Sequence, residues 1–378
     1  MSRPPPARPG DPLDRVDTPA LLVDLDAIEA NIAAMAAFAQ AAGCALRPHA
    51  KTHKCVEIAR LQLAAGAAGL CCQTVAEAEA MLASGVRDLL VTNHVVGPAK
   101  LARLAALARR VRVSTLTADR RHVAMLSAAA VAEGVSLEVL VEIDAGDARM
   151  GLGESDLLPV ARAVAQSPGL VLRGLQAYSG PFQHVREAGA RTQAAAETAR
   201  RAARARDLLR AEGLACPLIT GGGTGSFQDD AALGVLTEIQ PGSYVFMDRD
   251  YARNRDRGGG PYRPFAQSLF VRAGVLRARA DGVCYVDAGA KALNLDCGMP
   301  EVAGRGDLSF TKASDEQGRI EPADPARAPE LGAALMLVPS HCDPTVALYD
   351  TLVAVRGGRV EALWAVAPDP ARSPPPDR

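Results

Sequence analysis

Two short segments near opposite ends of the chain carry residue types that could do chemistry. His341 and Asp343 offer an imidazole and a carboxylate one residue apart, and together they could bind a divalent cation. Lys51 lies in a basic segment between His49 and His53. Neighbouring positive charge and partial burial would lower the pKa of this lysine and supply the neutral amine that forms an imine. Either segment alone would be ordinary, a surface loop or a solvated basic turn.

The donor atoms of the first segment indicate which metal would fit. Structural zinc sites normally have four protein ligands and are rich in thiolates, so His341 and Asp343 suit an open site that water and substrate complete. A carboxylate in place of a thiolate favours Mn²⁺ or Mg²⁺, although Zn²⁺ or Co²⁺ could bind.

Length, charge and composition narrow the class of protein. A chain of 378 residues is long enough for two domains. Its formal charge of −1 provides no field for nucleic acid or an anionic membrane, and no stretch approaches the roughly 18–20 apolar residues of a spanning helix. The proline-rich start has no apolar signal segment, and the eight cysteines lack a disulfide framework. We therefore expect a cytoplasmic protein with reduced thiols, and disordered tails at residues 1–11 and 371–378.

Short apolar strands alternate with amphipathic helices over residues 21–255. Eight strands are expected to end near residues 49, 72, 93, 117, 143, 178, 221 and 240, and the longest helix covers residues 185–212. Eight strand–helix units in this length predict a parallel (β/α)8 barrel, a TIM-type barrel of the α/β class. A doubly wound sheet is the alternative, and it is disfavoured because no Gly-x-Gly-x-x-Gly follows the first strand.

Residues 262–370 have a different residue pattern, with β-type runs in place of strand–helix alternation. These runs cover residues 268–275, 283–287, 334–338 and 351–355. The last one continues through Gly357 and Gly358 into residues 360–366, as expected for a hairpin. We predict a second, mostly β domain that carries the His341 loop and is joined by residues 12–20.

Polar residues follow the predicted barrel strands at the end where barrels place their active sites. In chain order they are Lys51, Gln73, Asn93, Arg149, Tyr178, residues 221–226 and Gln240. Gly222, Gly223 and Thr224 would let backbone N–H groups approach an anion, and a short helix starting at Ser226 would add its dipole. Phosphate binding after the seventh strand is therefore favoured over a flexible glycine turn.

Three motifs make a family resemblance specific. RPHAKTHK at residues 47–54 resembles the lysine motif of the D-threonine aldolase and D-serine dehydratase family, within the alanine racemase-like, fold type III pyridoxal phosphate enzymes. EIDAGDARMG at residues 142–151 is similar to the arginine motif of this family, and QPGSY at residues 240–244 is similar to its segment under the cofactor ring. The resemblance extends over nearly the whole chain, from residues 17–20 to the His341 loop.

The resemblance implies a cofactor role for each residue of the rim. Lys51 would bind pyridoxal 5'-phosphate covalently, Arg149 would contact its phenolate oxygen, and Tyr178 and Gln73 would line the site. The phosphate would be held by Gly222, Gly223 and Thr224. Gln240 stands where alanine racemases present an arginine to the pyridine nitrogen. A neutral amide there would change how strongly the ring accepts electrons.

The resemblance also implies a metal and a reaction. In this family the dehydratases have a zinc-binding His-x-Cys pair, whereas the aldolases have His-x-Asp. Because Asp343 takes the second ligand position after Cys342, we expect metal-dependent cleavage of a β-hydroxy-D-amino acid, such as D-threonine, to glycine and an aldehyde. The metal would lower the pKa of the β-hydroxyl, and His184 would remove its proton. A surface position at a helix terminus is the alternative for His184.

Other functions stay open at this point. A D-serine dehydratase would use the same lysine and metal to make pyruvate and ammonia. A β-hydroxyaspartate aldolase would need a cation for the distal carboxylate, for which Arg249, Arg253 and Arg255 are available. A racemase has no use for a metal, and a pyridoxal phosphate carrier would lack the second domain. By analogy with fold type III enzymes we also expect a homodimer.

Overall fold

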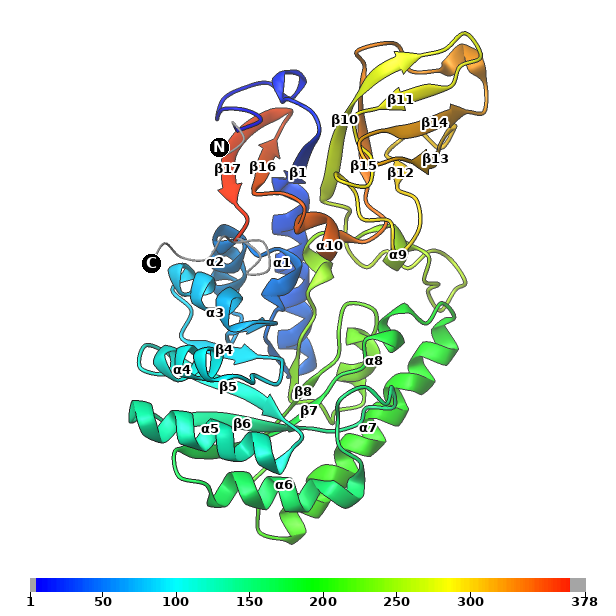
Figure 1. The fold of residues 1–378 in the computed structure, drawn as a ribbon. Coiled ribbons are helices and arrows are strands. Elements are labelled where there is room, and N and C mark those ends of the chain that lie inside the picture. The colour runs from blue at the N-terminus through cyan, green and yellow to red at the C-terminus, as the bar shows by residue number, and fades with distance from the viewer. Residues whose placement is uncertain (1–4, 368–378) are drawn as a thin grey trace.

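Eight parallel strands close into a barrel in the computed structural model, which describes residues 5–367 (Figure 1). The strands are β2 (Ala45–Leu46), β3 (Leu70–Cys72), β4 (Asp88–Val91), β5 (Arg112–Thr117), β6 (Leu137–Glu142), β7 (Leu170–Ala177), β8 (Leu218–Gly221) and β9 (Glu238–Ile239). They lie in the order β2-β9-β8-β7-β6-β5-β4-β3. The backbone N–H of Cys71 donates to the carbonyl oxygen of Pro48 at 2.9 Å, which closes the ring between β3 and the segment after β2. The predicted barrel is confirmed, with all eight strands present.

Helices cover the outside of the barrel. They are α1 (Leu25–Ala42), α2 (Val56–Ala64), α3 (Val75–Met81), α4 (Pro98–Leu107), α5 (Arg120–Glu133), α6 (Glu154–Gln166), α7 (Ala188–Ala211), which is the predicted long helix, and α8 (Phe227–Ala232). Although α1 precedes the first barrel strand, it contacts β2 and α8 and so fills the place of a helix after β9. The Asp24 side chain caps its start by accepting from Ala27 N–H at 3.0 Å, and left-handed Gly43 ends it. No helix among residues 5–367 is long and apolar enough to cross a membrane.

The alternation of side chains along each strand produces two apolar layers. Val139 of β6 belongs to a core that the strands share with the surrounding helices. The next residue, Leu140, instead meets Cys71, Leu90 and Leu116 from neighbouring strands in a smaller cluster. The barrel is therefore filled by side chains, and its site must lie at a rim.

At the amino ends of the barrel strands, the buried guanidinium of Arg47 forms ion pairs with carboxylates at the starts of β4 and β9. Arg47 is 1% exposed, and its Nε donates to Glu238 at 2.9 Å while its Nη1 donates to Asp88 at 2.9 Å. Arg173 adds a second ion pair with Asp88 at 2.9 Å. Because Asp88 opens β4 and Glu238 opens β9, this network lies opposite the rim that the sequence predicts as the site.

Replacing Arg47 by methionine is expected to destabilise the fold strongly. The change leaves the carboxylate of Glu238, which is 2% exposed, without its cation, whereas Asp88 keeps Arg173; breaking a buried ion pair in this way typically costs about 3–5 kcal/mol. Urea unfolding of the Arg47→Met variant measures the loss. Arg103→Met is the control, because it removes an ion pair with Glu79 in which both side chains are about a third exposed or more, and should cost only about 0–1 kcal/mol. Equal losses in both variants would contradict this account of barrel closure.

The remaining strands form a mostly β domain above the barrel (Figure 1). They are β1 (Ala20–Asp24), β10 (Leu269–Ala278), β11 (Cys284–Val286), β12 (Glu301–Val302), β13 (Leu308–Ala313), β14 (Gly318–Pro322), β15 (Ala334–Val338), β16 (Thr351–Arg356) and β17 (Arg359–Ala365). Their order is β13-β14-β11-β10-β1-β16-β17, with β15 pairing to both β10 and β12. The predicted runs correspond to β10, β11 and β15, and to the β16–β17 hairpin. The sequence did not predict β12, β13 and β14.

Two expected boundaries differ from the structure. β1 falls within the range 21–255 expected for the barrel, but it pairs with β10 and β16, because both of its faces are apolar and buried in the β domain. Residues 5–11, expected to be part of a disordered tail, pack on this domain. Ala7 is buried there, and the N–H of Gly10 donates to the carbonyl of Val360 at 2.8 Å. The expected tails at residues 1–4 and 371–378 lie outside the described residues.

Candidate active site

Lys51 and Asp343 come from opposite ends of the chain and meet at the rim of the barrel. The short turn η2 (Ala50–Thr52) presents Lys51, whose side chain is 39% exposed. Asp343 lies in α10 (Cys342–Val346), which packs against η2. The Nζ of Lys51 is 3.7 Å from Oδ2 of Asp343. The C-terminal loop therefore reaches the barrel of its own chain.

The charge environment of Lys51 is the opposite of the one expected from its sequence neighbours. Burial lowers the pKa of His49 and His53, to about 4 for His53, so both imidazoles are neutral near pH 7. Burial also opposes a charge on Lys51, but Asp343 and Tyr178 outweigh it and raise the pKa of the amine. The expected lowering of the lysine pKa is therefore wrong, because the neighbouring histidines carry no charge and Asp343 does.

The predicted arginine and tyrosine of the cofactor site lie together. The guanidinium carbon of Arg149 is 5.6 Å from the ring centre of Tyr178, and its Nη2 donates to Glu142 at 3.2 Å. Glu142 also pairs with Nε2 of His94 at 2.8 Å. The Arg149 side chain is half exposed, so it is accessible at the rim. Since Tyr178 also acts on the pKa of Lys51, the structure brings all three predicted residues to one place.

The glycine-rich segment after β8 is packed too tightly for side chains. Gly222 has a φ of 67°, and a Cβ there would lie 2.5 Å from the carboxylate of Asp230. A Cβ on Gly223 would lie 2.6 Å from Oε1 of Gln183. Thr224 is buried beside them. Local packing therefore requires both glycines, and the phosphate-binding role of the segment stays a prediction.

The helix predicted to start at Ser226 is α8, and it brings a buried carboxyl group to this segment. The hydroxyl of Ser226 donates to Oδ2 of Asp230 at 2.6 Å. Burial raises the pKa of Asp230 to about 7, even though the bond from Ser226 acts in the other direction. The protonation state of the carboxyl group beside the glycine segment therefore changes near neutral pH.

This raised pKa predicts a pH-dependent stability. A carboxyl group whose folded pKa lies above its ordinary value of 3.8 contributes stability at low pH that is lost as the pH rises through about 7. Urea unfolding of the unaltered protein should therefore show a fall in the free energy of unfolding between these values. Asp230→Asn cannot titrate, so this component of the fall should disappear. The same pH dependence in both proteins would contradict the assignment.

Gln240 and Gln176 pair with each other inside the barrel. The Nε2 of Gln240 donates to Gln176 at 2.9 Å and to Thr220 at 2.8 Å, and Gln176 donates back at 3.0 Å. Both N–H groups of Gln240 are thus engaged in hydrogen bonds. The residue implied as the partner of the pyridine nitrogen therefore carries a neutral amide. Gln73 follows β3, and its Oε1 accepts from the hydroxyl of Thr92 at 3.5 Å.

His184 has a carboxylate partner that fixes its tautomer. It ends the short helix η4 (Pro181–His184), and its Nδ1 is 2.6 Å from Oδ2 of Asp250. Its ring centre is 4.9 Å from that of Tyr251. Burial opposes ionisation of Asp250, but His184 and Arg186 lower the pKa of this carboxyl to about 2. An ionised carboxylate keeps the proton on Nδ1 and leaves Nε2 as the acceptor.

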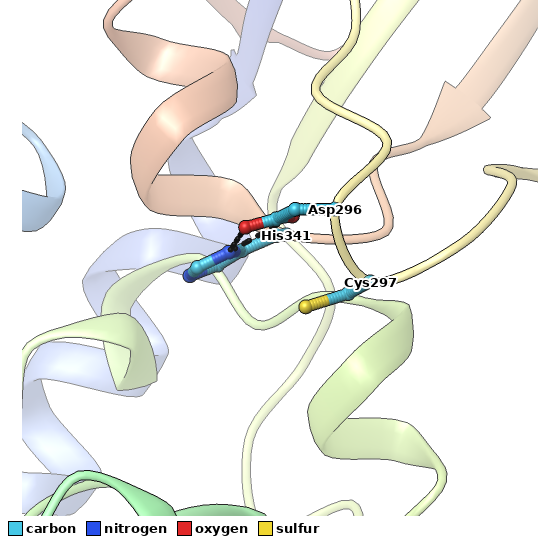
Figure 2. A group of neighbouring side chains, drawn as sticks. All are labelled: Asp296, Cys297 and His341. Atoms are coloured by element: carbon cyan, nitrogen blue, oxygen red, sulfur yellow. Dashed lines mark hydrogen bonds and ion pairs between the residues drawn. The ribbon is translucent and has the colours of Figure 1, made fainter.

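His341 faces a carboxylate that the sequence did not predict. Asp296 and Cys297, on the loop between β11 and β12, gather beside its imidazole (Figure 2). The Nδ1 of His341 is 3.2 Å and 3.0 Å from the two carboxylate oxygens of Asp296. One ligand atom from each of these three residues lies within 4.8 Å of the other two. Asp343 is not a member of this group and faces Lys51 instead.

The helix α9 (Arg249–Ala252) joins the parts of the site. Asp248, which caps its start, accepts from the backbone N–H of Tyr251 at 2.9 Å and from that of Cys342 at 2.9 Å. The same helix carries Asp250. One short element therefore positions both the predicted base and the predicted metal loop.

The sequence prediction did not include Asp250, which pairs with His184, or Asp296 and Cys297, which lie beside His341. A carboxylate next to a thiol in a loop before Gly298 was a readable signal for a metal ligand pair. Nothing in the sequence connected that pair to His341, since the two positions are more than 40 residues apart. Asp250 likewise had no sequence signal that connected it to His184.

Two family models match consecutive parts of the chain. The model of the alanine racemase N-terminal domain matches residues 23–250, and that of a serine dehydratase domain matches residues 268–355. The first match covers more than half of the chain. This protein belongs to the alanine racemase N-terminal domain family. Membership confirms the resemblance read from the motifs and supports pyridoxal phosphate as the cofactor.

Three similar proteins extend the likeness over nearly the whole chain. A D-threonine aldolase from Arthrobacter sp is 49% identical over 370 residues, which cover 97% of this chain and 96% of that protein. A 3-hydroxy-D-aspartate aldolase from Paracoccus denitrificans (strain Pd 1222) is 41% identical, with 96% of this chain and 94% of that protein covered. The crystal structure of a D-threonine aldolase from Filomicrobium marinum superposes with a TM-score of 0.92 at 44% identity, covering 97% and 98% of the two chains.

Proposed function

We propose that this protein is a carbon–carbon lyase that uses pyridoxal phosphate and a divalent metal to cleave β-hydroxy-D-amino acids, such as D-threonine, to glycine and an aldehyde. The observation that carries the proposal is the meeting of Lys51 and Asp343, with 3.7 Å between Nζ and Oδ2. A covalent cofactor on that lysine would lie beside the carboxylate of the predicted metal loop. The D-threonine aldolases among the similar proteins support this reaction.

Lys51, Arg149 and Tyr178 fit the cofactor because they converge on one part of the rim. Lys51 would hold it covalently, and Arg149 would face its phenolate oxygen. Gly222, Gly223 and Thr224 would hold the phosphate, with Gln73 and Gln240 on the remaining sides. When bound, the cofactor supplies an electron sink for the pair of electrons released by Cα–Cβ cleavage.

His341 and Asp343 fit a hard divalent ion such as Mn²⁺ or Mg²⁺. Burial opposes ionisation of Asp343, but Lys51 and His341 keep the pKa of its carboxyl below the ordinary value. The bond between Asp296 and Nδ1 of His341 leaves Nε2 as the ligand atom. A bound ion supplies a Lewis acid that lowers the pKa of the substrate β-hydroxyl.

Cys342, between the two proposed ligands, favours the aldolase over the dehydratase. Its thiol is buried and donates to Oδ1 of Asp343 at 3.3 Å. Burial raises the pKa of this thiol well above its ordinary value, and the residue is 0% exposed, whereas the side chain of Asp343 is 17% exposed. The carboxylate of Asp343 is therefore the donor that this loop offers beside His341.

His184 would take the proton of the β-hydroxyl through Nε2, because Asp250 holds the Nδ1 proton in place. The imidazolium that forms is stabilised by the same carboxylate, which is already ionised. Tyr251 packs against the imidazole, and burial, together with Tyr178 and Asp343, raises the pKa of its hydroxyl well above the ordinary value. These contacts support a role for His184 on the side of the site where the lysine and the proposed metal ligands meet.

A second candidate substrate is a β-hydroxy-D-aspartate. Arg253, one of the three arginines available for a distal carboxylate, is 40% exposed and donates to the carbonyl of Cys297 at 2.7 Å, beside the His341 group. The 3-hydroxy-D-aspartate aldolase among the similar proteins points to the same substrate. Cleavage of this compound would give glycine and glyoxylate.

We also propose a homodimer in the cytoplasm. Leu276 and Leu331 of the β domain are more than half exposed, and large apolar side chains of this kind are often covered by a partner subunit. All eight cysteines are free thiols, as in proteins kept reduced in the cell.

The product of the reaction distinguishes the candidate functions. Purified protein with pyridoxal phosphate and Mn²⁺ is incubated with D-threonine, L-threonine, D-serine and β-hydroxy-D-aspartate, before and after EDTA. We expect glycine and acetaldehyde from D-threonine, none from L-threonine, and loss of activity with EDTA that Mn²⁺ restores. Pyruvate from D-serine as the main product would move the assignment to the dehydratase. Activity that EDTA leaves intact would contradict the metal.

Variants of the lysine and the histidine separate cofactor binding from proton transfer. Lys51→Ala should lose both turnover and the visible absorption band of the covalently bound cofactor. His184→Gln should keep that band and lose about 10²–10⁴-fold in kcat, the usual contribution of a general base. Absorption spectra and steady-state rates measure both effects. Unchanged turnover in His184→Gln would show that another group is the base.

A further inference from the structure

The loop between β11 and β12 supplies a second set of metal ligands to His341. Cys297 Sγ, one carboxylate oxygen of Asp296 and one imidazole nitrogen of His341 lie within 4.8 Å of one another, and Figure 2 shows the three side chains gathered at one point. Nδ1 of His341 already faces Asp296 at 3.0 Å. Three atoms of different types at this spacing could move onto one ion through small side-chain rotations.

This loop is held in place from both sides, so its ligands are positioned before an ion binds. Arg253 donates to the carbonyl oxygen of Cys297 at 2.7 Å. The hydroxyl of Ser340, next to His341, donates to the carbonyl of Asn294 at 2.9 Å. The side chain of Asn294 in turn accepts from the backbone N–H of Asp296 at 3.0 Å. The segment carrying the carboxylate and the thiol is thus bonded to the segment carrying the imidazole.

The charges around the thiol also favour a cation. Burial, Asp250, Asp296 and Asp248 all raise the pKa of Cys297, to about 12, so an ion that binds there displaces the thiol proton. Arg253 and Arg186 lie nearby, and both pair with Asp250, which offsets its charge. A divalent ion at the thiol would therefore meet mainly the carboxylates of Asp296 and Asp248.

We propose that Cys297, Asp296 and His341 form a binding site for a thiophilic divalent ion, Zn²⁺ or Cd²⁺, distinct from the hard-metal pair of His341 and Asp343. One thiolate, one imidazole and one carboxylate are the donors that Zn²⁺ takes, and three protein ligands leave a position for water. Binding releases the thiol proton to solvent. Mn²⁺ and Mg²⁺ prefer oxygen and imidazole donors, which the pair of His341 and Asp343 offers.

The two sites cannot be filled together, because they share one imidazole. A neutral imidazole has one nitrogen with a free lone pair and one that carries a proton. An ion on Nδ1 in the thiol site leaves Nε2 protonated and unable to bind a second ion. Zn²⁺ or Cd²⁺ therefore withdraws His341 from the hard-metal site and inhibits the enzyme. This inhibition rests on the proposed function, whereas the binding of the thiophilic ion does not.

The test titrates the full-length protein with CdCl₂ and follows the ultraviolet charge-transfer band of a cadmium–thiolate bond. The unaltered protein should show the band at one equivalent, and Cys297→Ser should lose it, with cadmium affinity lower by more than about tenfold. Cys44→Ser is the matched control, since Cys44 is the other half-buried cysteine, and it should keep the band. A band that survives in Cys297→Ser would overturn the site.

A second measurement tests the competition by electron paramagnetic resonance of Mn²⁺, which does not depend on turnover. Zn²⁺ should release bound Mn²⁺ from the unaltered protein at concentrations at least about tenfold below those needed with Cys297→Ser. The same shift should appear in the zinc inhibition of D-threonine cleavage, while Cys297→Ser keeps its Mn²⁺-supported rate. Equal release from both proteins would overturn the competition. A protein that binds Cd²⁺ through Cys297 but cleaves no substrate would refute the proposed function and leave the thiol site supported.

Discussion

The buried carboxylate of Asp248 holds the two halves of the site together. It accepts one hydrogen bond from Tyr251 in the segment leaving the barrel and another from Cys342 in the C-terminal loop, both at 2.9 Å. Residues separated by about 90 positions in the chain are thereby fixed at one point. The lysine turn and α10 depend on this join, because neither the barrel nor the β domain alone contains both Lys51 and Asp343. The catalytic geometry therefore depends on the hydrogen bonds that join the two domains.

Electrostatics at this junction follow from which groups face each other across it. Lys51 is surrounded in sequence by basic residues, yet the histidines beside it are buried and neutral, and Asp343 raises its pKa. The lysine thus starts as a cation paired with a carboxylate. Attachment of the cofactor would replace the three N–H donors of that ammonium group by one imine nitrogen, which would leave Asp343 more available to a metal ion. In this way cofactor attachment and metal binding would support each other at one carboxylate.

The barrel could be predicted from the sequence because each buried parallel strand is a short apolar run between amphipathic helices. β13 could have been predicted, because Ser309 and Thr311 alternate with Leu308 and Phe310 as in a half-buried strand, whereas β12 has only two residues and offers no such pattern. The predicted rim residues come from strand ends, which a barrel brings to one face. The partners of His184 and His341 could not be read, because Asp250 and Asp296 meet them only through the packing of loops from different domains.

We propose that a single chain builds the whole site from Lys51, His341 and Asp343. Anomalous diffraction from crystals grown with pyridoxal phosphate and Mn²⁺ tests it most directly. We expect continuous density between the cofactor and Lys51, and one manganese peak at bonding distance from His341 and Asp343 of the same chain. A manganese peak bound by residues of two different chains, or one at Asp296 and Cys297 with Asp343 unligated, would contradict it.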